Sequence, residues 1–156
     1  MLYFTVAVFG MGVLLGLDTL VSQAFGGRRL DECHAWLLHG VCLSFGLLVP
    51  LTFLLLLFFP LLPAWGIHPA VLREAIPYLK ALVWGLLPLL LFCSFRRYLQ
   101  AMNQVKPILF AMISANLMNA FGNWVLIFGK LGAPAMGAEG AGWSTTLSRV
   151  YMMVVL

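Results

Sequence analysis

Three asparagines lie within one long uncharged stretch of this sequence. Asn116, Asn119 and Asn123 fall between Pro107 and Gly129. Helical spacings of three and four place all three amides on one face. Amides in hydrocarbon must hydrogen-bond, so this face either joins two helices, at about 1 kcal/mol per amide, or lines a water-filled cavity. Because a single interhelical contact needs fewer than three amides, the spacing favours a cavity lining.

A second polar group closes the first apolar stretch. Asp18 shares a helical face with Ser22, and Thr19 and Gln23 form the adjacent pair. A carboxylate inside a membrane costs at least about 2.5 kcal/mol unless it is paired or hydrated. We therefore expect Asp18 to face the protein interior. It would serve either a hydrogen-bonded contact between helices or a direct ion or substrate role, with Gln23 as a further structural or coupling candidate.

A lone cation lies in the last apolar stretch. Arg149 falls near mid-membrane, where it needs a partner or water, and it too is a structural or coupling candidate. Glu139 opens the same stretch, and an anion there suits the positive end of the helix dipole. The residues between them are small and allow close helix approach: Gly140, Gly142, Ser144, Thr145 and Ser148.

The remaining polar residues offer no catalytic or metal chemistry. The sequence has no nucleophile beside a base, no paired carboxylates and no phosphate loop, so no enzyme is expected. Cys33, His34, His39 and Cys42 fall within ten residues of each other, but zinc ligands are usually spaced around a turn that folds them inward. We expect no metal site and no cofactor. Arg96, Arg97 and Tyr98 are typical of an anchor at the membrane surface.

Composition shows which elements must hold these residues. Hydrophobic residues make up 63% of the 156-residue chain and charged residues 9%, and no Asp, Glu, Lys or Arg occurs between Cys33 and Leu72. About 20 apolar residues form a helix long enough to cross about 30 Å of hydrocarbon. The formal net charge of +4 comes from Lys and Arg scattered between apolar blocks, which indicates topology determinants and not nucleic-acid binding.

The apolar runs predict an all-α, polytopic membrane helix bundle that forms a single transmembrane domain over residues 1–156. About five transmembrane helices are expected, at about 3–25, 35–60, 76–99, 107–129 and 139–156. The expected breaks are Gly26 with Gly27, Pro60 with Pro63, and the glycines from Gly129 to Gly142. Pro77 and Pro107 suit first helical turns, and Pro50 and Pro88 are expected to kink the helices that contain them.

The basic residues predict an orientation. The helix ends and connections after the first and third spans hold Arg28, Arg29, Arg96, Arg97 and Lys106, and those after the second and fourth hold Arg73, Lys80 and Lys130. The positive-inside rule places the first set in the cytoplasm, so the chain would start outside and end inside. An odd number of spans with that start predicts a missing upstream helix, and a last span of about 17 residues predicts truncation.

Four motifs in this order resemble the multidrug and toxic compound extrusion (MATE) family of secondary transporters. They are residues 17–26 (LDTLVSQAFG), residues 96–101 (RRYLQA), the stretch from Asn119 to Asn123, and residues 137–145 (GAEGAGWST). The resemblance implies a fragment covering helices two to six of a twelve-helix protein with two six-helix lobes. It therefore implies a partial six-helix lobe, whose partner would be the missing second lobe.

The resemblance also implies an activity. Such proteins are antiporters that export small amphipathic, often cationic, compounds by alternating access in exchange for Na⁺ or H⁺, and they use no cofactor. Asn119, Asn123 and Thr145 fall where the family lines its first-lobe cavity. Some proton-coupled members have Asp where Asn123 stands, and an amide does not titrate. The expected location is the plasma (inner) membrane, as a multi-pass protein in contact with the lipid bilayer.

Two alternatives remain open at this stage. One is a lipid or polysaccharide flippase of related fold, whose cavity would need more cations to hold anionic headgroups, and Arg149 is the residue that favours it. The other is a non-transporting membrane scaffold subunit, which would not need three amides on one helix face.

Overall fold

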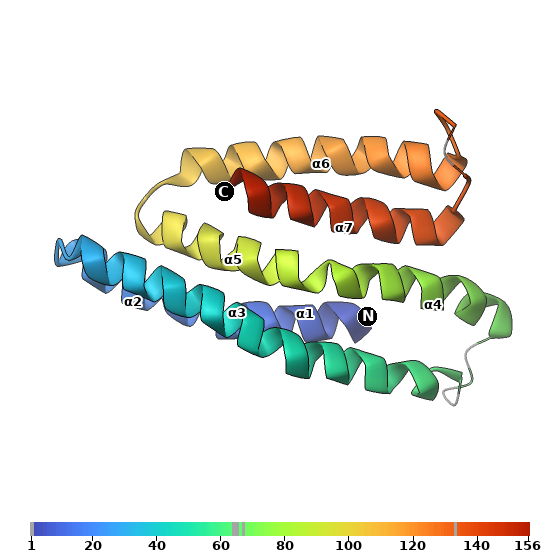
Figure 1. Cartoon of the computed structure of the whole chain (residues 1–156), viewed down its shortest axis with the longest axis horizontal. Coiled ribbons are helices and arrows are strands. Elements are labelled where there is room, and N and C mark those ends of the chain that lie inside the picture. The colour runs from blue at the N-terminus through green and yellow to red at the C-terminus, as the bar shows by residue number, and fades with distance from the viewer. Residues whose placement is uncertain (1, 64–65, 67, 133) are drawn as a thin grey trace.

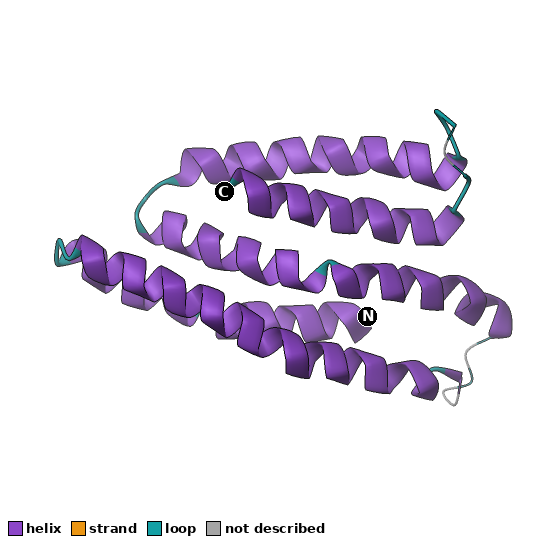
Figure 2. Ribbon diagram, viewed as in Figure 1, coloured by secondary structure: helices purple, strands orange, loops and turns teal. Residues whose placement is uncertain are grey.

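The protein is a bundle of helices, seen here in a computed structural model that describes residues 2–63, 66, 68–132 and 134–156. No strand occurs among these residues, which confirms the all-α prediction (Figure 2). In chain order the elements are α1 (Leu2–Val13), α2 (Gly16–Gly26), α3 (Leu30–Phe58), the short 3₁₀ helix η1 (Phe59–Leu61), α4 (Pro69–Trp84), α5 (Leu86–Ala101), α6 (Val105–Phe128) and α7 (Gly137–Val155).

The first expected span consists of two helices. Between α1 and α2 the backbone tightens at Leu14 and Leu15, where the N–H of Leu15 donates to the carbonyl of Gly12 and that of Leu17 to the carbonyl of Leu14. Such bonds to the third preceding residue are typical of 3₁₀ geometry. The two helices still form one membrane-length unit from Tyr3 to Gly26.

The second span begins earlier than the sequence predicted. α3 starts at Leu30, with two carboxylates in its first turn, where they suit the helix dipole. One of them, Glu32, pairs with Arg29 at 2.8 Å. The helix runs through Pro50 without interruption and ends at Phe58, and η1 follows it. The expected break at Pro60 is therefore confirmed, and Pro50 does not divide the helix.

The third span differs most from its prediction. It begins at Pro69, whose missing N–H is harmless in a first turn, and the N–H of Ala70 donates to His68 Nδ1 at 3.3 Å. Pro77 therefore lies inside α4, and its expected place in a first turn was wrong. The prediction began the helix at the edge of the apolar run, but the helix continues through the charged residues Arg73 and Glu74.

The expected kink in this span falls at Gly85, between α4 and α5. The two helices meet at an angle of 45°. Pro88 explains the position, because its ring nitrogen has no hydrogen to donate to the carbonyl of Trp84, four residues earlier. The kink predicted from Pro88 is thus present, and it opens three residues before the proline.

The last two helices form a hairpin. α6 ends at Gly129, whose φ of 65° lies in the left-handed region that glycine adopts without strain. A Cβ at Gly129 would also lie 2.8 Å from the backbone nitrogen of Ala135. The expected turn over Gly129 to Gly142 ends sooner, because α7 begins at Gly137.

The helices pack around α5 and α7. In Figure 1, α6 and α7 lie on one side of the bent α4–α5 pair, and α1, α2 and α3 lie on the other. α7 contacts α6, α4 and α5, whereas α5 contacts α2 and α3 as well. The α2–α3 and α5–α6 connections are at one end of the bundle, and the α3–α4 and α6–α7 connections are at the other (Figure 1). This alternation is the one that the orientation prediction requires.

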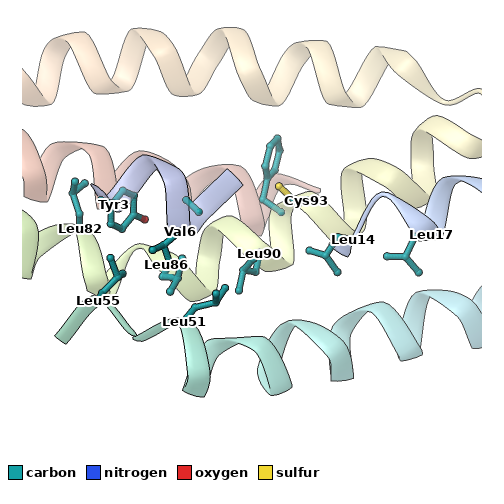
Figure 3. Close-up of a cluster of buried hydrophobic side chains, with 12 residues drawn as sticks. Tyr3, Val6, Leu14, Leu17, Leu51, Leu55, Leu82, Leu86, Leu90 and Cys93 are labelled. Atoms are coloured by element: carbon teal, nitrogen blue, oxygen red, sulfur yellow. The ribbon is translucent and has the colours of Figure 1, made fainter. Parts of the chain in front are cut away.

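An apolar core joins the two sides of the bundle. Leu14, Leu55, Leu86 and Leu90 are fully buried within it. Figure 3 shows these side chains close together, Leu14 from the junction of α1 and α2, Leu55 from α3, and Leu86 and Leu90 from α5. The break at Gly85 therefore lies directly beside this core, because the next residue, Leu86, is one of its fully buried members.

The helices have the length and composition of membrane spans. Among the described residues, Tyr3–Gly26, Leu30–Leu61 and Val105–Phe128 are each long and apolar enough to cross a bilayer, and the bent α4–α5 pair makes a fourth candidate. α7 stands where the fifth span was expected, but it is more polar than the others. This architecture confirms a polytopic membrane helix bundle.

Candidate functional site in the helix bundle

The asparagine face of α6 has one bonded pair. Asn123 Nδ2 donates to Asn119 Oδ1 at 3.0 Å, and both side chains are half-buried. Asn123 Oδ1 is buried and has no hydrogen-bond partner within the described residues. An unpaired carbonyl oxygen away from water is costly, so this atom is a ready acceptor for a donor or a cation.

Asn116 behaves differently from the other two amides. Its Nδ2 donates to the carbonyl of Met112 in the same helix at 2.9 Å, and its side chain is exposed. The helix is continuous over all three asparagines, so they lie along one side of it. The hydrogen bonds nevertheless divide them into a pair, Asn119 with Asn123, and a separate Asn116.

A tight contact between α6 and α7, which we call the α6–α7 seam, fixes the backbone behind this pair. It consists of Gly122 and Leu126 on α6 with Gly140 and Ser144 on α7. A Cβ at Gly140 would lie 2.7 Å from the carbonyl oxygen of Leu126, and one at Gly122 would lie 2.6 Å from Ser144 Oγ. Ser144 Oγ donates to the carbonyl of Asn119 at 3.0 Å. Small residues here let the backbones approach closely, as predicted.

Thr145, the third residue of the predicted cavity, follows Ser144. Its Oγ1 donates to the carbonyl of Ala141 in its own helix at 2.9 Å, and its side chain is half-buried. The hydroxyl oxygen keeps its capacity to accept a hydrogen bond. Within the described part of the chain no hydrogen bond links Thr145 to Asn119 or Asn123, so the two groups lie on neighbouring helices without a direct bond between them.

Arg149 finds its partner on the first helix. Its guanidinium donates to the hydroxyl of Tyr3 and lies 5.1 Å from the centroid of the Tyr3 ring. The same side chain passes Gly85, where a Cβ would lie 3.1 Å from Arg149 Nη1. Next to it, Thr146 Oγ1 donates to the carbonyl of Ala81 at 2.8 Å. The helix break thus makes room for Arg149, and the expected need for a partner is met by an aromatic hydroxyl.

Asp18 pairs with a residue that the sequence analysis assigned to the membrane surface. Arg97 Nη1 lies 2.8 Å from Asp18 Oδ2, which joins α2 to α5. The carboxylate's other oxygen, Oδ1, and the Nε of Arg96 are buried without a partner in the described residues. Arg97 is therefore more than an interfacial anchor. The pair fits the expectation that Asp18 faces inward to contact another helix.

The other candidates near these sites have local roles. Gln23 is exposed, one turn beyond Thr19, and the Ser22 hydroxyl donates to the carbonyl of Asp18. Glu139 lies in the first turn of α7, as expected, and accepts a hydrogen bond from Trp143 Nε1 at 3.4 Å.

Two partners were missed at the level of sequence, Tyr3 for Arg149 and Arg97 for Asp18. The partners are 146 and 79 residues apart in the chain, so no local spacing brings them together. The sequence did contain a chemical indication that such partners exist. A buried ion needs an opposite or hydrogen-bonding partner, and each of these polar side chains lies in an otherwise apolar helix.

Comparison with known proteins agrees with this architecture. The profile of the MatE family matches residues 1–125. The chain is 32% identical over 153 residues to the probable multidrug resistance protein NorM of Mesorhizobium japonicum, which covers 97% of this chain and 33% of that protein. It is 35% identical over 144 residues to the probable multidrug resistance protein NorM of Rhodopseudomonas palustris, covering 92% of this chain and 30% of that protein.

A third relative is the multidrug resistance protein NorM of Vibrio parahaemolyticus, 28% identical over 149 residues that cover 96% of this chain and 33% of that protein. The chain thus spans about a third of the length of the curated relatives it matches. Its apolar, membrane-length helices define a polytopic integral membrane protein. The chain belongs to the multidrug and toxic compound extrusion family.

Proposed function

We propose that this chain forms part of the first lobe of a secondary active multidrug antiporter. The transporter would export small amphipathic or cationic compounds in exchange for Na⁺ or H⁺ by alternating access, with a second lobe as its partner. It would reside in the plasma (inner) membrane. The names of the relatives, which are multidrug resistance proteins, support the substrate class.

The observation that carries this proposal is the unpartnered, buried Oδ1 of Asn123. Asn119 holds the amide of Asn123 through a 3.0 Å hydrogen bond, so Oδ1 is presented in a fixed direction. Behind the pair, α6 and α7 approach closely at the α6–α7 seam, and Ser144 donates to the carbonyl of Asn119. A fixed acceptor inside a membrane suits a cationic or hydrogen-bonding ligand, and Thr145 on the adjacent helix would add a second oxygen.

The test is a segment exchange. The matching segment of the Mesorhizobium japonicum relative is replaced by this chain, and export of a fluorescent cationic dye is measured in cells. We expect export from the exchange protein, and its loss when Asn119 and Asn123 are both changed to Leu, with near-normal expression. The matched control is Asn116→Leu, which removes an exposed amide that bonds only to its own helix.

Several outcomes would contradict the proposal. If the double Leu variant exports dye normally, the pair does not line the transport path. If the double Leu variant fails to accumulate in folded form, the asparagine pair instead holds helices together. Its loss would then leave hydrogen-bonding groups unsatisfied at about 1 kcal/mol each. If the exchange protein moves labelled lipid across the bilayer but not dye, the flippase alternative holds instead.

The place of Asn123 in the transport path is tested separately by Asn123→Asp in the exchange protein. The substitution keeps the size of the side chain and adds a titratable group. If Asn123 faces the transport path, dye export should acquire a new dependence on pH. Superimposable pH profiles of the two versions would place Asn123 outside that path.

The orientation is tested by cysteine labelling. With the three native cysteines replaced by Ser, a cysteine introduced at Gly27 should react with a membrane-impermeant reagent only from the cytoplasm. One at Gly66, at the opposite end of the bundle, should react only from outside. The reverse pattern would overturn the assigned orientation.

A further inference from the structure

A second concave surface lies away from the asparagine pair, on the flank of the bundle between α3 and α4–α5. This surface, which we call the lateral groove, has a volume of about 900 Å³. Binding sites for small molecules have volumes of about 300–1,000 Å³. Among the residues that line it are Val49 and Phe53 on α3 and Lys80 and Trp84 on α4.

The walls of the lateral groove are suited to hydrocarbon. Val49 and Phe53, one turn apart on α3, expose 71% and 68% of their surfaces, and Trp84 on the facing wall exposes 73%. Large apolar side chains at these positions are ordinary in a span that contacts lipid. A lipid acyl chain lying along α3 would cover them without any polar mismatch.

Lys80 gives the groove its chemical selectivity. It is the one charged residue among those that line the groove. The ion pairs found in the described part of the chain are Arg29 with Glu32 and Arg97 with Asp18, so Lys80 has no carboxylate partner there. Lys80 lies 11 residues into α4, about 16 Å along the helix axis from its first residue. An ammonium on an apolar span can extend its flexible stem towards the headgroups, where anions are available to it.

We propose that the lateral groove is a binding site for an anionic phospholipid, with the acyl chain along α3 and the headgroup phosphate on Lys80. A net negative headgroup complements Lys80 better than a zwitterionic one, whose phosphate already has its own cation. The same ammonium repels cationic compounds, so the groove is unsuited to the substrates proposed for the asparagine pair. The site is independent of that proposed function.

The experiment uses tryptophan fluorescence, because Trp84 is part of the groove. The chain is prepared with Trp84 as its single tryptophan, the other four being changed to Phe. It is then reconstituted in phosphatidylcholine vesicles that contain brominated phosphatidylglycerol or brominated phosphatidylcholine. Bromine quenches a nearby indole, so the ratio of quenching gives the relative affinity of the two lipids at this position. We expect phosphatidylglycerol to be preferred by about fivefold.

Matched variants make the result specific. Lys80→Gln should reduce the preference at Trp84 to that of bulk lipid, and Lys80→Arg should keep it. A version with Trp124 as its single tryptophan reports on the exposed face of α6, far from Lys80 in sequence. Its ratio of quenching by the two lipids should not change with either substitution. Helical circular dichroism and size-exclusion elution establish that each variant is folded.

Three results would overturn the proposal. The first is equal quenching of Trp84 by the two lipids, and the second is a preference that survives Lys80→Gln. The third is an absence of quenching by either lipid, which would mean that a protein segment or a second copy of the chain covers the groove.

Discussion

The α6–α7 seam and the lateral groove bring helices together in opposite ways. In the seam, glycines and a serine let backbones approach until a single added methyl group at Gly140 would lie 2.7 Å from a carbonyl oxygen. In the groove, Val49 and Phe53 on α3 and Trp84 on α4 leave most of their own surfaces open. Lipid is as apolar as these side chains, so burying them gains little, and close backbone packing is what holds membrane helices together.

The largest effect is expected from Gly140→Ala. The new Cβ meets backbone atoms of Leu126, which cannot rotate away, so α6 and α7 must separate. We expect the free energy of unfolding to fall by about 2 kcal/mol or more, measured by denaturant titration in detergent micelles.

Gly12→Ala is the matched control for that change, since a Cβ at Gly12 would meet no atom within 4 Å. Its stability should stay within about 0.5 kcal/mol of the parent. Similar losses of unfolding free energy at the two glycines would show that the close backbone approach at the seam does not contribute more to stability than other helix positions.

The ion pair between α2 and α5 should give an intermediate effect, because long side chains join these helices. Arg97→Gln leaves the carboxylate of Asp18 without its cation. Both side chains are partly exposed, so we expect a loss of only about 1 kcal/mol. Combining it with Asp18→Asn should recover part of that loss in a double-mutant cycle. A coupling energy of zero would mean that the pair does not hold the two helices together.

A smaller loss is expected at the contact between α7 and α4. Thr146→Val removes the hydroxyl that donates to the carbonyl of Ala81 and keeps the shape of the side chain. Hydrogen bonds between membrane helices average about 0.6 kcal/mol, and thermal unfolding in detergent should show a loss of that size. Thr145→Val, whose hydroxyl bonds within its own helix, should lose less. Equal losses would remove the distinction between bonds across the helix contact and bonds within α7.

The smallest effect is expected in the groove. Phe53→Ala deletes a ring that is 68% exposed, so no tightly packed cavity is created. The unfolding free energy should change by less than about 0.5 kcal/mol. A loss as large as that of Gly140→Ala would mean that the groove walls are packed against something and contribute to stability as the seam does.

The sequence predicted the helical architecture because apolar length and breakers act locally. Gly27 ends the first span and Pro88 kinks the third for reasons that lie within a few residues of each. The start of α4 was predicted wrongly at residue 76, because a helix can extend past the membrane into charged sequence, as it does from Pro69.

The candidate site could be predicted only in part. The types and spacing of Asn116, Asn119 and Asn123 were informative, but spacing alone does not decide that Asn123 bonds to Asn119 whereas Asn116 bonds to the carbonyl of Met112. The partners of Asp18 and Arg149 depend on how the helices are arranged in space. The sequence indicates that each charged side chain needs a partner, whereas the arrangement of the helices decides which residue that partner is.

The polarity of α7 has a consequence for how the protein is made. Glu139, Arg149 and a row of hydroxyl side chains leave this helix with a weak insertion signal, and each of them is costly for the translocon to release into lipid alone. α4 and α6 are synthesised earlier, and they carry the backbone carbonyls of Ala81 and Asn119 that accept from Thr146 and Ser144. We therefore expect biogenesis to be sequential, with α7 leaving the translocon by docking onto helices that are already in the bilayer.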